Sequence, residues 1–189
     1  MNKFIDYNSP EKEIIKEKFT TIPYMDVWIS SIVEGYIYEN IIKVDEEGYK
    51  EEYTDRYGKK EGEYKRWYSN GQLWVQLYYK ERKLDGESKW WYDNGQIRIQ
   101  THCKEGKKEG EFKQWSNNGK LLLQQYYKGG KLEGEYKVWH QNGQLMLQSY
   151  YKEGKKEGEI KGWDENGQLK IYKIYTGGEV VEDLLLLKP

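Results

Sequence analysis

The sequence predicts a mainly β protein in which tandem 24-residue hairpins form an elongated, twisted antiparallel sheet. The first observation is the period itself, because a repeat of roughly 20–50 residues is typical of arrays of structural units. The second is that two runs of β-forming residues flank an Asn-Gly pair in each repeat, which favours a hairpin. The repeated rows are Trp67, Trp91, Trp115, Trp139 and Trp163; Gly62, Gly86, Gly110, Gly134 and Gly158; and the pairs Asn70-Gly71, Asn94-Gly95, Asn118-Gly119, Asn142-Gly143 and Asn166-Gly167.

Residues 62–85 show how each hairpin is expected to form. A two-residue type I′ turn needs positive φ at both central positions, which Asn and Gly tolerate better than other residues. We therefore expect Asn70-Gly71 to form this turn and to place Tyr68 opposite Leu73. The glycine that opens each repeat fits a longer turn or a bulge.

Alternation along the predicted strands sorts the side chains onto two faces of the sheet. One face is expected to be apolar, with the rows that begin at Tyr64, Leu73, Val75 and Tyr79. The other face carries rows of Glu, Lys, Trp and Gln, which begin at Glu63, Lys65, Trp67 and Gln76. Cross-strand pairs between the Glu and Lys rows are expected to add a few tenths of a kcal/mol each.

The chain divides into four segments by pattern. These are an acidic, partly helical segment at 1–35, a degenerate capping repeat at 36–57, five repeats at 58–178 and a tail at 179–189. The first 57 residues hold 7 Lys and Arg against 13 Asp and Glu, whereas residues 58–178 hold 23 against 16. This asymmetry fits two solvated surfaces, docking of the two segments on each other, or attraction of an acidic partner by the array.

The two ends of the chain are less regular than the array. Ser9 followed by Pro10 predicts a helix over Pro10–Phe19, because these residues favour the start of a helix. Met25–Glu34 fits a second helix or a strand equally well. The apolar run Leu184–Leu187 fits a tail that folds over the apolar face, or a contact with a partner or with a second copy in a homodimer.

Several functional classes are disfavoured by composition. Cys103 is the single cysteine, so no disulfide can form within the chain. The N-terminal residues lack the apolar core of a signal peptide, and no apolar run approaches the roughly 20 residues that span a bilayer. We therefore expect a soluble, cytoplasmic protein.

The sequence shows no catalytic or cofactor-binding pattern, so we expect no enzyme activity, no cofactor and no metal site. His102 and Cys103 are neighbours on a strand and should point to opposite faces, so they cannot act together. His140 is expected to be a solvated strand end. The glutamate row repeats beside a lysine row, which indicates a charge ladder rather than a catalytic acid pair.

Lysines interleaved with aromatic residues are also found in nucleic-acid and membrane-surface proteins. The positive charge of the array is diluted by its own glutamates, and only Arg66, Arg82 and Arg98 lie within it. A nucleic-acid site usually concentrates positive charge. We therefore expect no nucleic-acid partner, and we keep a peripheral membrane scaffold as an alternative.

The motif Gly-Glu-Tyr-Lys-x-Trp-x-x-Asn-Gly-Gln-Leu, seen at Gly134–Leu145, resembles the variant form of the MORN (membrane occupation and recognition nexus) repeat. The resemblance recurs five times over about residues 58–178. It implies a chain of antiparallel hairpins in one elongated sheet. Some variant arrays carry an antitoxin label, so an antitoxin that neutralises a cognate toxin is a further alternative.

The function expected first is a non-catalytic scaffold or adaptor that binds another protein along its sheet. An aromatic row flanked by adaptable polar groups suits protein recognition. The partner-binding residues are expected to be Trp91, Trp115 and Trp139, together with Lys89, Lys113 and Lys137.

Overall fold

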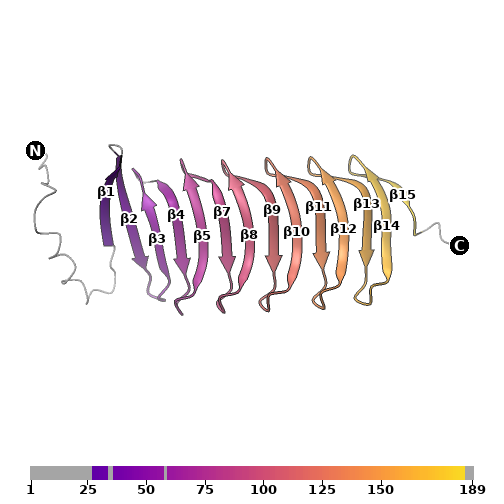
Figure 1. Cartoon of the computed structure of the whole chain (residues 1–189), viewed down its shortest axis with the longest axis horizontal. Helices are drawn as coiled ribbons and strands as arrows, with labels where there is room; N and C mark the ends of the chain where they lie inside the picture. The colour runs from indigo at the N-terminus through magenta and orange to yellow at the C-terminus, as the bar shows by residue number, and fades with distance from the viewer. Residues whose placement is uncertain (1–26, 34–35, 58, 186–189) are drawn as a thin grey trace, which may run out of the picture.

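The protein forms one open, antiparallel, 15-stranded sheet with its strands in sequence order (Figure 1). The computed structural model describes residues 27–33, 36–57 and 59–185, with side chains from Asn40 onward. No helix occurs within these ranges, and hence none that could cross a membrane. The predicted all-β repeat fold is therefore confirmed.

The strands are β1 (Val27–Val33), β2 (Tyr36–Val44), β3 (Lys50–Asp55), β4 (Lys60–Trp67), β5 (Leu73–Lys80), β6 (Lys83–Leu84), β7 (Gly86–Trp91), β8 (Ile97–Lys104), β9 (Lys107–Trp115), β10 (Leu121–Lys128), β11 (Lys131–Trp139), β12 (Leu145–Lys152), β13 (Lys155–Trp163), β14 (Leu169–Thr176) and β15 (Glu179–Asp183).

The N-terminal end of the sheet decides one of the open alternatives. Residues 27–33 are strand β1, paired with β2 from Val27 opposite Ile42 to Val33 opposite Tyr36, so Met25–Glu34 is not a helix. The run Val-Trp-Ile-Ser-Ser-Ile-Val is rich in β-branched residues, which favour a strand. The helix expected at Pro10–Phe19 lies outside the described residues.

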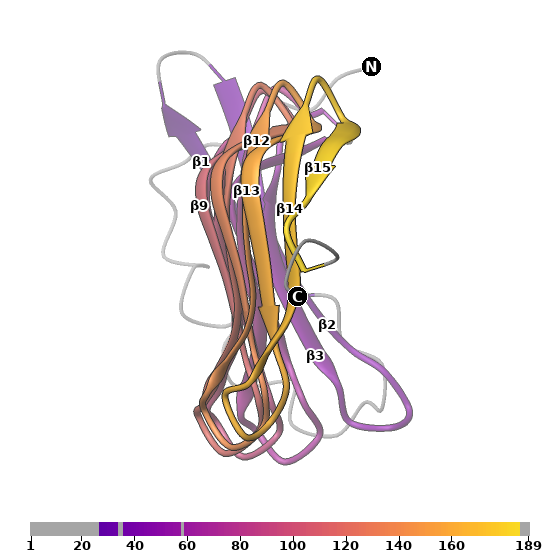
Figure 2. The same cartoon turned by 90° about the vertical axis from the view of Figure 1, so that its right-hand side faces the viewer.

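The described sheet is a single layer, seen end-on in Figure 2. Its best-buried cluster, formed by Tyr64, Val75 and Leu77, lies on one face, which we call the apolar face. The buried apolar residues are few for a chain of this size: Ile41, Tyr64, Val75, Leu77, Cys103, Phe112 and Ile160. Stability must therefore come from contacts between neighbouring repeats, because no second layer in the described residues covers the sheet.

The Asn-Gly loops differ from the expected two-residue turn. The Gly71 amide donates to the Tyr68 carbonyl at 2.9 Å, and the Tyr68 amide donates to the Gln72 carbonyl at 2.8 Å. This is a three-residue loop with only Gly71 at positive φ (+83°), so the type I′ prediction and the Tyr68–Leu73 pairing were wrong.

The connections at the opposite edge of the sheet carry the two-residue turns instead. Both central residues have positive φ, as at Glu105 (+50°) and Gly106 (+81°), which defines a type I′ turn. A carboxylate from the preceding connection binds the first amide of each turn; Asp85, for example, accepts from Glu105 at 3.0 Å. The acids in this row are Glu61, Asp85, Glu109, Glu133 and Glu157.

A bulge at the start of β5 changes the two faces. Trp67 pairs with Leu73, but Arg66 pairs with Val75, so Trp74 is an extra residue on the second strand. Paired residues project to the same face, and the extra residue reverses the alternation. Leu73 therefore lies with Trp67, not on the apolar face as predicted, and Trp74 packs against the apolar cluster.

The glycine that opens each repeat lies at a second irregularity. Between β3 and β4 the register shifts between Tyr53–Tyr64 and Thr54–Glu61, and Gly62 has φ +74° there. The equivalent glycines are Gly86, Gly110, Gly134 and Gly158, all at positive φ. The bulge predicted for this row is confirmed, because glycine tolerates this backbone conformation at low cost.

Both ends of the array extend the sheet. Residues 36–57 form a hairpin whose loop repeats the pattern of the later ones, since Gly48 donates to the Asp45 carbonyl at 3.0 Å. At the other end β15 pairs with β14, and the Leu184 amide donates to the Tyr172 carbonyl at 2.8 Å. The tail to Leu185 thus continues along β14 rather than folding over the apolar face, while Leu186 and Leu187 lie outside the described residues.

Asparagine side chains join successive loops. In the second repeat Asn94 accepts from the Gln96 amide at 3.0 Å and donates to the Asn117 carbonyl of the next loop at 2.8 Å. Asn70 and Asn142 make the same pair of bonds. The asparagines are thus retained in this loop for bonding between repeats rather than for positive φ.

Changing Asn94 to Asp tests this role, because Asp keeps the acceptor for Gln96 but cannot donate to Asn117. We expect a loss of about 1 kcal/mol in the free energy of unfolding, measured by urea denaturation. Asn94→Ala should cost more, because it removes both bonds. An Asp variant as stable as the wild type would contradict a bond between repeats that contributes to stability.

Candidate functional site: the tryptophan face

The tryptophans expected to bind a partner lie in one row on the face opposite the apolar face. We call this face, which carries the Glu, Lys, Gln and Trp rows, the tryptophan face. Trp91 pairs with Ile97, Trp115 with Leu121 and Trp139 with Leu145, and all three tryptophans are half-buried. The bulges therefore create a continuous tryptophan–leucine stripe: Trp67, Trp91, Trp115, Trp139 and Trp163 with Leu73, Ile97, Leu121, Leu145 and Leu169.

The lysines expected to bind a partner lie beside this stripe in ion pairs. Lys89 Nζ is 2.6 Å from Glu87, and Lys113 and Lys137 are 2.7 Å from Glu111 and Glu135. Each pair joins residues two apart on one strand, so the Glu–Lys contacts run along strands rather than across them as predicted. With side chains 27–32% exposed, these lysines form part of a locally neutral ladder.

The glutamine row completes the ladder across the strands. Gln100 donates to Glu87 and Gln124 donates to Glu111, each at 2.6 Å, and Gln148 donates to Glu135 at 3.0 Å. Tyr126 adds a bond to Glu111 at 3.1 Å. The polar groups that flank the stripe are therefore held in fixed positions, which limits the side-chain entropy that partner binding would cost.

Hydrogen bonding shifts the ionisation of these glutamates. Burial opposes ionisation of Glu111, but bonds from Lys113, Gln124 and Tyr126 outweigh it and lower the pKa of Glu111. The bond from Lys89 is the main cause of the lowered pKa of Glu87. These carboxylates are charged at neutral pH, so the ladder is formed under those conditions.

The lowered pKa values predict a loss of stability in acid. A carboxylate whose pKa is lower in the folded state stabilises the fold above its unfolded pKa of about 4.3, and this contribution disappears as the pH falls through the folded pKa. We expect the urea midpoint of the wild type to fall from pH 5 downward, and to fall less for Glu111→Gln. Identical pH profiles for the two proteins would contradict a contribution from this carboxylate.

The histidines and the cysteine do not form a reactive group. His102 is exposed while Cys103 is 5% exposed, so the two neighbours face opposite sides as predicted. Burial raises the pKa of the Cys103 thiol, which makes it a poor nucleophile. Among the described residues no three His, Cys, Asp or Glu side chains lie close enough to hold a metal ion.

His140 has a structural role that the sequence did not reveal. Its Nε2 lies 2.8 Å from the Trp163 carbonyl in the next repeat, and Tyr68 and Tyr92 donate to the equivalent carbonyls of Trp91 and Trp115. His140 is thus a link between repeats and not simply a solvated strand end. The recurrence of ring-bearing residues at this position was the available signal.

The geometry of the repeats agrees with the comparison to known families. Five segments match the MORN repeat variant, namely residues 60–81, 84–104, 108–128, 132–153 and 156–176. The chain belongs to the MORN repeat variant family. Each MORN segment begins beside a bulge glycine and ends at a type I′ turn, so the matched unit is one hairpin of the sheet. A comparison with curated proteins finds no match.

Proposed function

We propose that this MORN repeat chain is a non-catalytic, cytoplasmic scaffold that binds another protein along its tryptophan face. The observation that carries this proposal is the tryptophan–leucine stripe, which repeats identical chemistry on a face that no described element covers. Strands lie about 4.8 Å apart, so two-strand repeats present the stripe at intervals of about 10 Å. An extended partner could meet the same pair of side chains several times.

The arrangement resembles the anatomy of a protein interface. Such interfaces combine apolar anchors, often Trp, with a polar rim that excludes water. Here Trp115 and Leu121 supply the anchor, and the Lys113–Glu111–Gln124 group supplies the rim. Because the lysine is paired, we propose that it orients the partner through its remaining donors rather than as an isolated positive charge.

Two variants in the same repeat separate the two faces. Trp115→Leu removes an anchor of the stripe, while Tyr127→Leu removes a ring from the apolar face, where Tyr127 contacts Phe112 at 6.3 Å between ring centroids. With a partner captured from the native host, Trp115→Leu is expected to weaken binding by about 2 kcal/mol, roughly thirtyfold in Kd. Tyr127→Leu should bind like the wild type.

The outcome of this comparison is interpreted only for variants whose circular dichroism matches the wild type. A loss confined to Tyr127→Leu would place the partner on the apolar face and contradict the proposal. The identity of the captured protein also decides between an adaptor and an antitoxin, since an antitoxin would retain a toxin. Flotation with anionic vesicles tests the membrane scaffold, and flotation without any protein partner would replace the proposal.

A further inference from the structure

The first complete repeat ends in a strained turn. Glu81 and Arg82 occupy the two central positions of this turn with φ +50° and +71°. Glycine occupies the second position in each of the four later turns, at Gly106, Gly130, Gly154 and Gly178. Because a side chain at positive φ destabilises the backbone, an arginine there is an outlier that the fold itself does not require.

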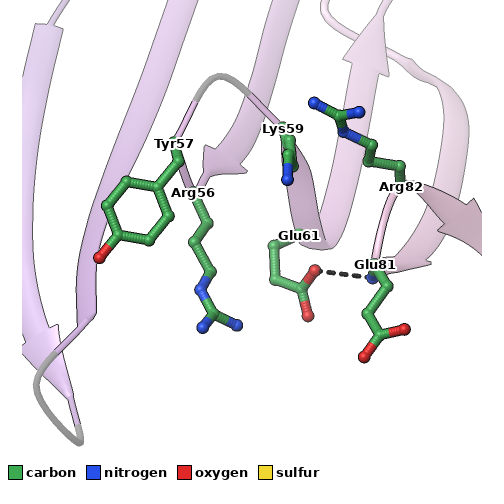
Figure 3. A pocket seen from close by; sticks show the side chains of 6 residues that line it. All are labelled: Arg56, Tyr57, Lys59, Glu61, Glu81 and Arg82. Carbon is green, nitrogen blue, oxygen red and sulfur yellow. Dashed lines mark hydrogen bonds between the residues drawn. The ribbon is translucent and has the colours of Figure 1, made fainter.

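A hollow of about 380 Å³ lies beside this turn, between it and the preceding one. Figure 3 shows its lining, which comprises Arg56, Tyr57, Lys59, Glu61, Glu81 and Arg82. Tyr57 is also at positive φ (+55°), and 66% of it is exposed. Two adjacent turns thus hold large side chains in strained positions around one hollow.

The charges in the hollow favour a singly charged anion. Three cations and two carboxylates line it, and the Glu61 carboxylate is occupied by the Glu81 amide at 2.9 Å (Figure 3). Within the ranges that the structure describes, the side chains of Lys59 and Arg82 form no ion pair. An arginine side chain presents a planar fork of donors that matches a carboxylate.

We propose that this hollow binds a carboxylate of an acidic segment in a partner protein, through Arg82 and Lys59 with the Tyr57 ring beside it. The site lies on the edge of the sheet that carries the type I′ turns, whereas the tryptophan–leucine stripe adjoins the Asn-Gly loops at the other edge. It is therefore a second site, and its failure would leave the proposed function of the stripe unaffected.

The test uses a fluorescein-labelled hexaglutamate peptide, with fluorescence anisotropy on the full-length chain. Arg82→Gly and Lys59→Gln are each expected to weaken peptide binding about tenfold, as loss of a charged hydrogen bond does. Lys107→Gln is the matched control, because Lys107 follows its own type I′ turn as Lys59 follows the turn at Tyr57; it should change binding by less than about twofold. Arg82→Gly should at the same time raise the temperature of unfolding, because it relieves the strain.

Three results would overturn the proposal. One is peptide binding that is absent in the wild type or unchanged in Arg82→Gly and Lys59→Gln. Another is an equal loss in Lys107→Gln, which would indicate diffuse attraction to the basic array. The third is preferential binding of a phosphoserine peptide or of phosphatidylserine vesicles that is lost in the same two variants, which would assign the hollow to phosphate.

Discussion

Replacing Phe112 with alanine is expected to lower the free energy of unfolding by about 3 kcal/mol. Phe112 is 8% exposed and contacts Tyr127, with Lys108 Nζ 4.4 Å from the centre of its ring. It lies in the middle of the array, where repeats on both sides depend on the contact. In a sheet with one layer, a cavity at this position cannot be filled from a second layer, so little recovery is expected.

Tyr150→Ala provides the control for Phe112→Ala. Tyr150 is also an aromatic residue of a central repeat, but it is 51% exposed. Its truncation should cost no more than about 0.5 kcal/mol. Both values come from urea denaturation with intact m-values. Equal losses would indicate that the burial of the apolar face does not determine stability.

Gly86→Ala is expected to cost about 2–4 kcal/mol, through two separate effects. Gly86 has φ +129°, a conformation that side chains rarely adopt. A Cβ there would also lie 3.0 Å from the Cβ of Tyr78, which the backbone of β5 holds in place. Neither strain can be relieved without moving a strand.

Gly62→Ala separates the two effects. Gly62 occupies the same position in the preceding repeat with φ +74°, but a Cβ there would meet nothing within 4 Å. Its substitution should cost only about 1 kcal/mol, the conformational part. If thermal unfolding shows the same loss for both variants, the close approach of Tyr78 does not contribute.

The period, the hairpins and the composition of each row could be predicted from the sequence, because they depend on local pattern. The turn type could not, because Asn-Gly fits both a two-residue turn and the three-residue loop. The loop is favoured by the bond from Asn94 to Asn117 in the next repeat, which the sequence of one repeat does not reveal. Turn type is thus decided by contact between repeats.

The composition of the site could be predicted only in part. The tryptophan and lysine rows were found, but the bulge at Trp74 was not, because an extra residue leaves the 24-residue period unchanged. The Leu73 row was therefore assigned to the wrong face. The ion pairing of the lysines was also assigned to the wrong direction, since Glu87 and Lys89 meet along one strand.

The most direct test of the tryptophan face is photo-crosslinking from two adjacent positions. Lys113 lies on the tryptophan face and Gln114, paired with Leu123, lies on the apolar face. A benzophenone amino acid at each position is irradiated in cells of the native host. The account predicts a covalent adduct with another protein from position 113 and none from position 114. An adduct from position 114 alone, or equal adducts from both, would contradict binding along the tryptophan–leucine stripe.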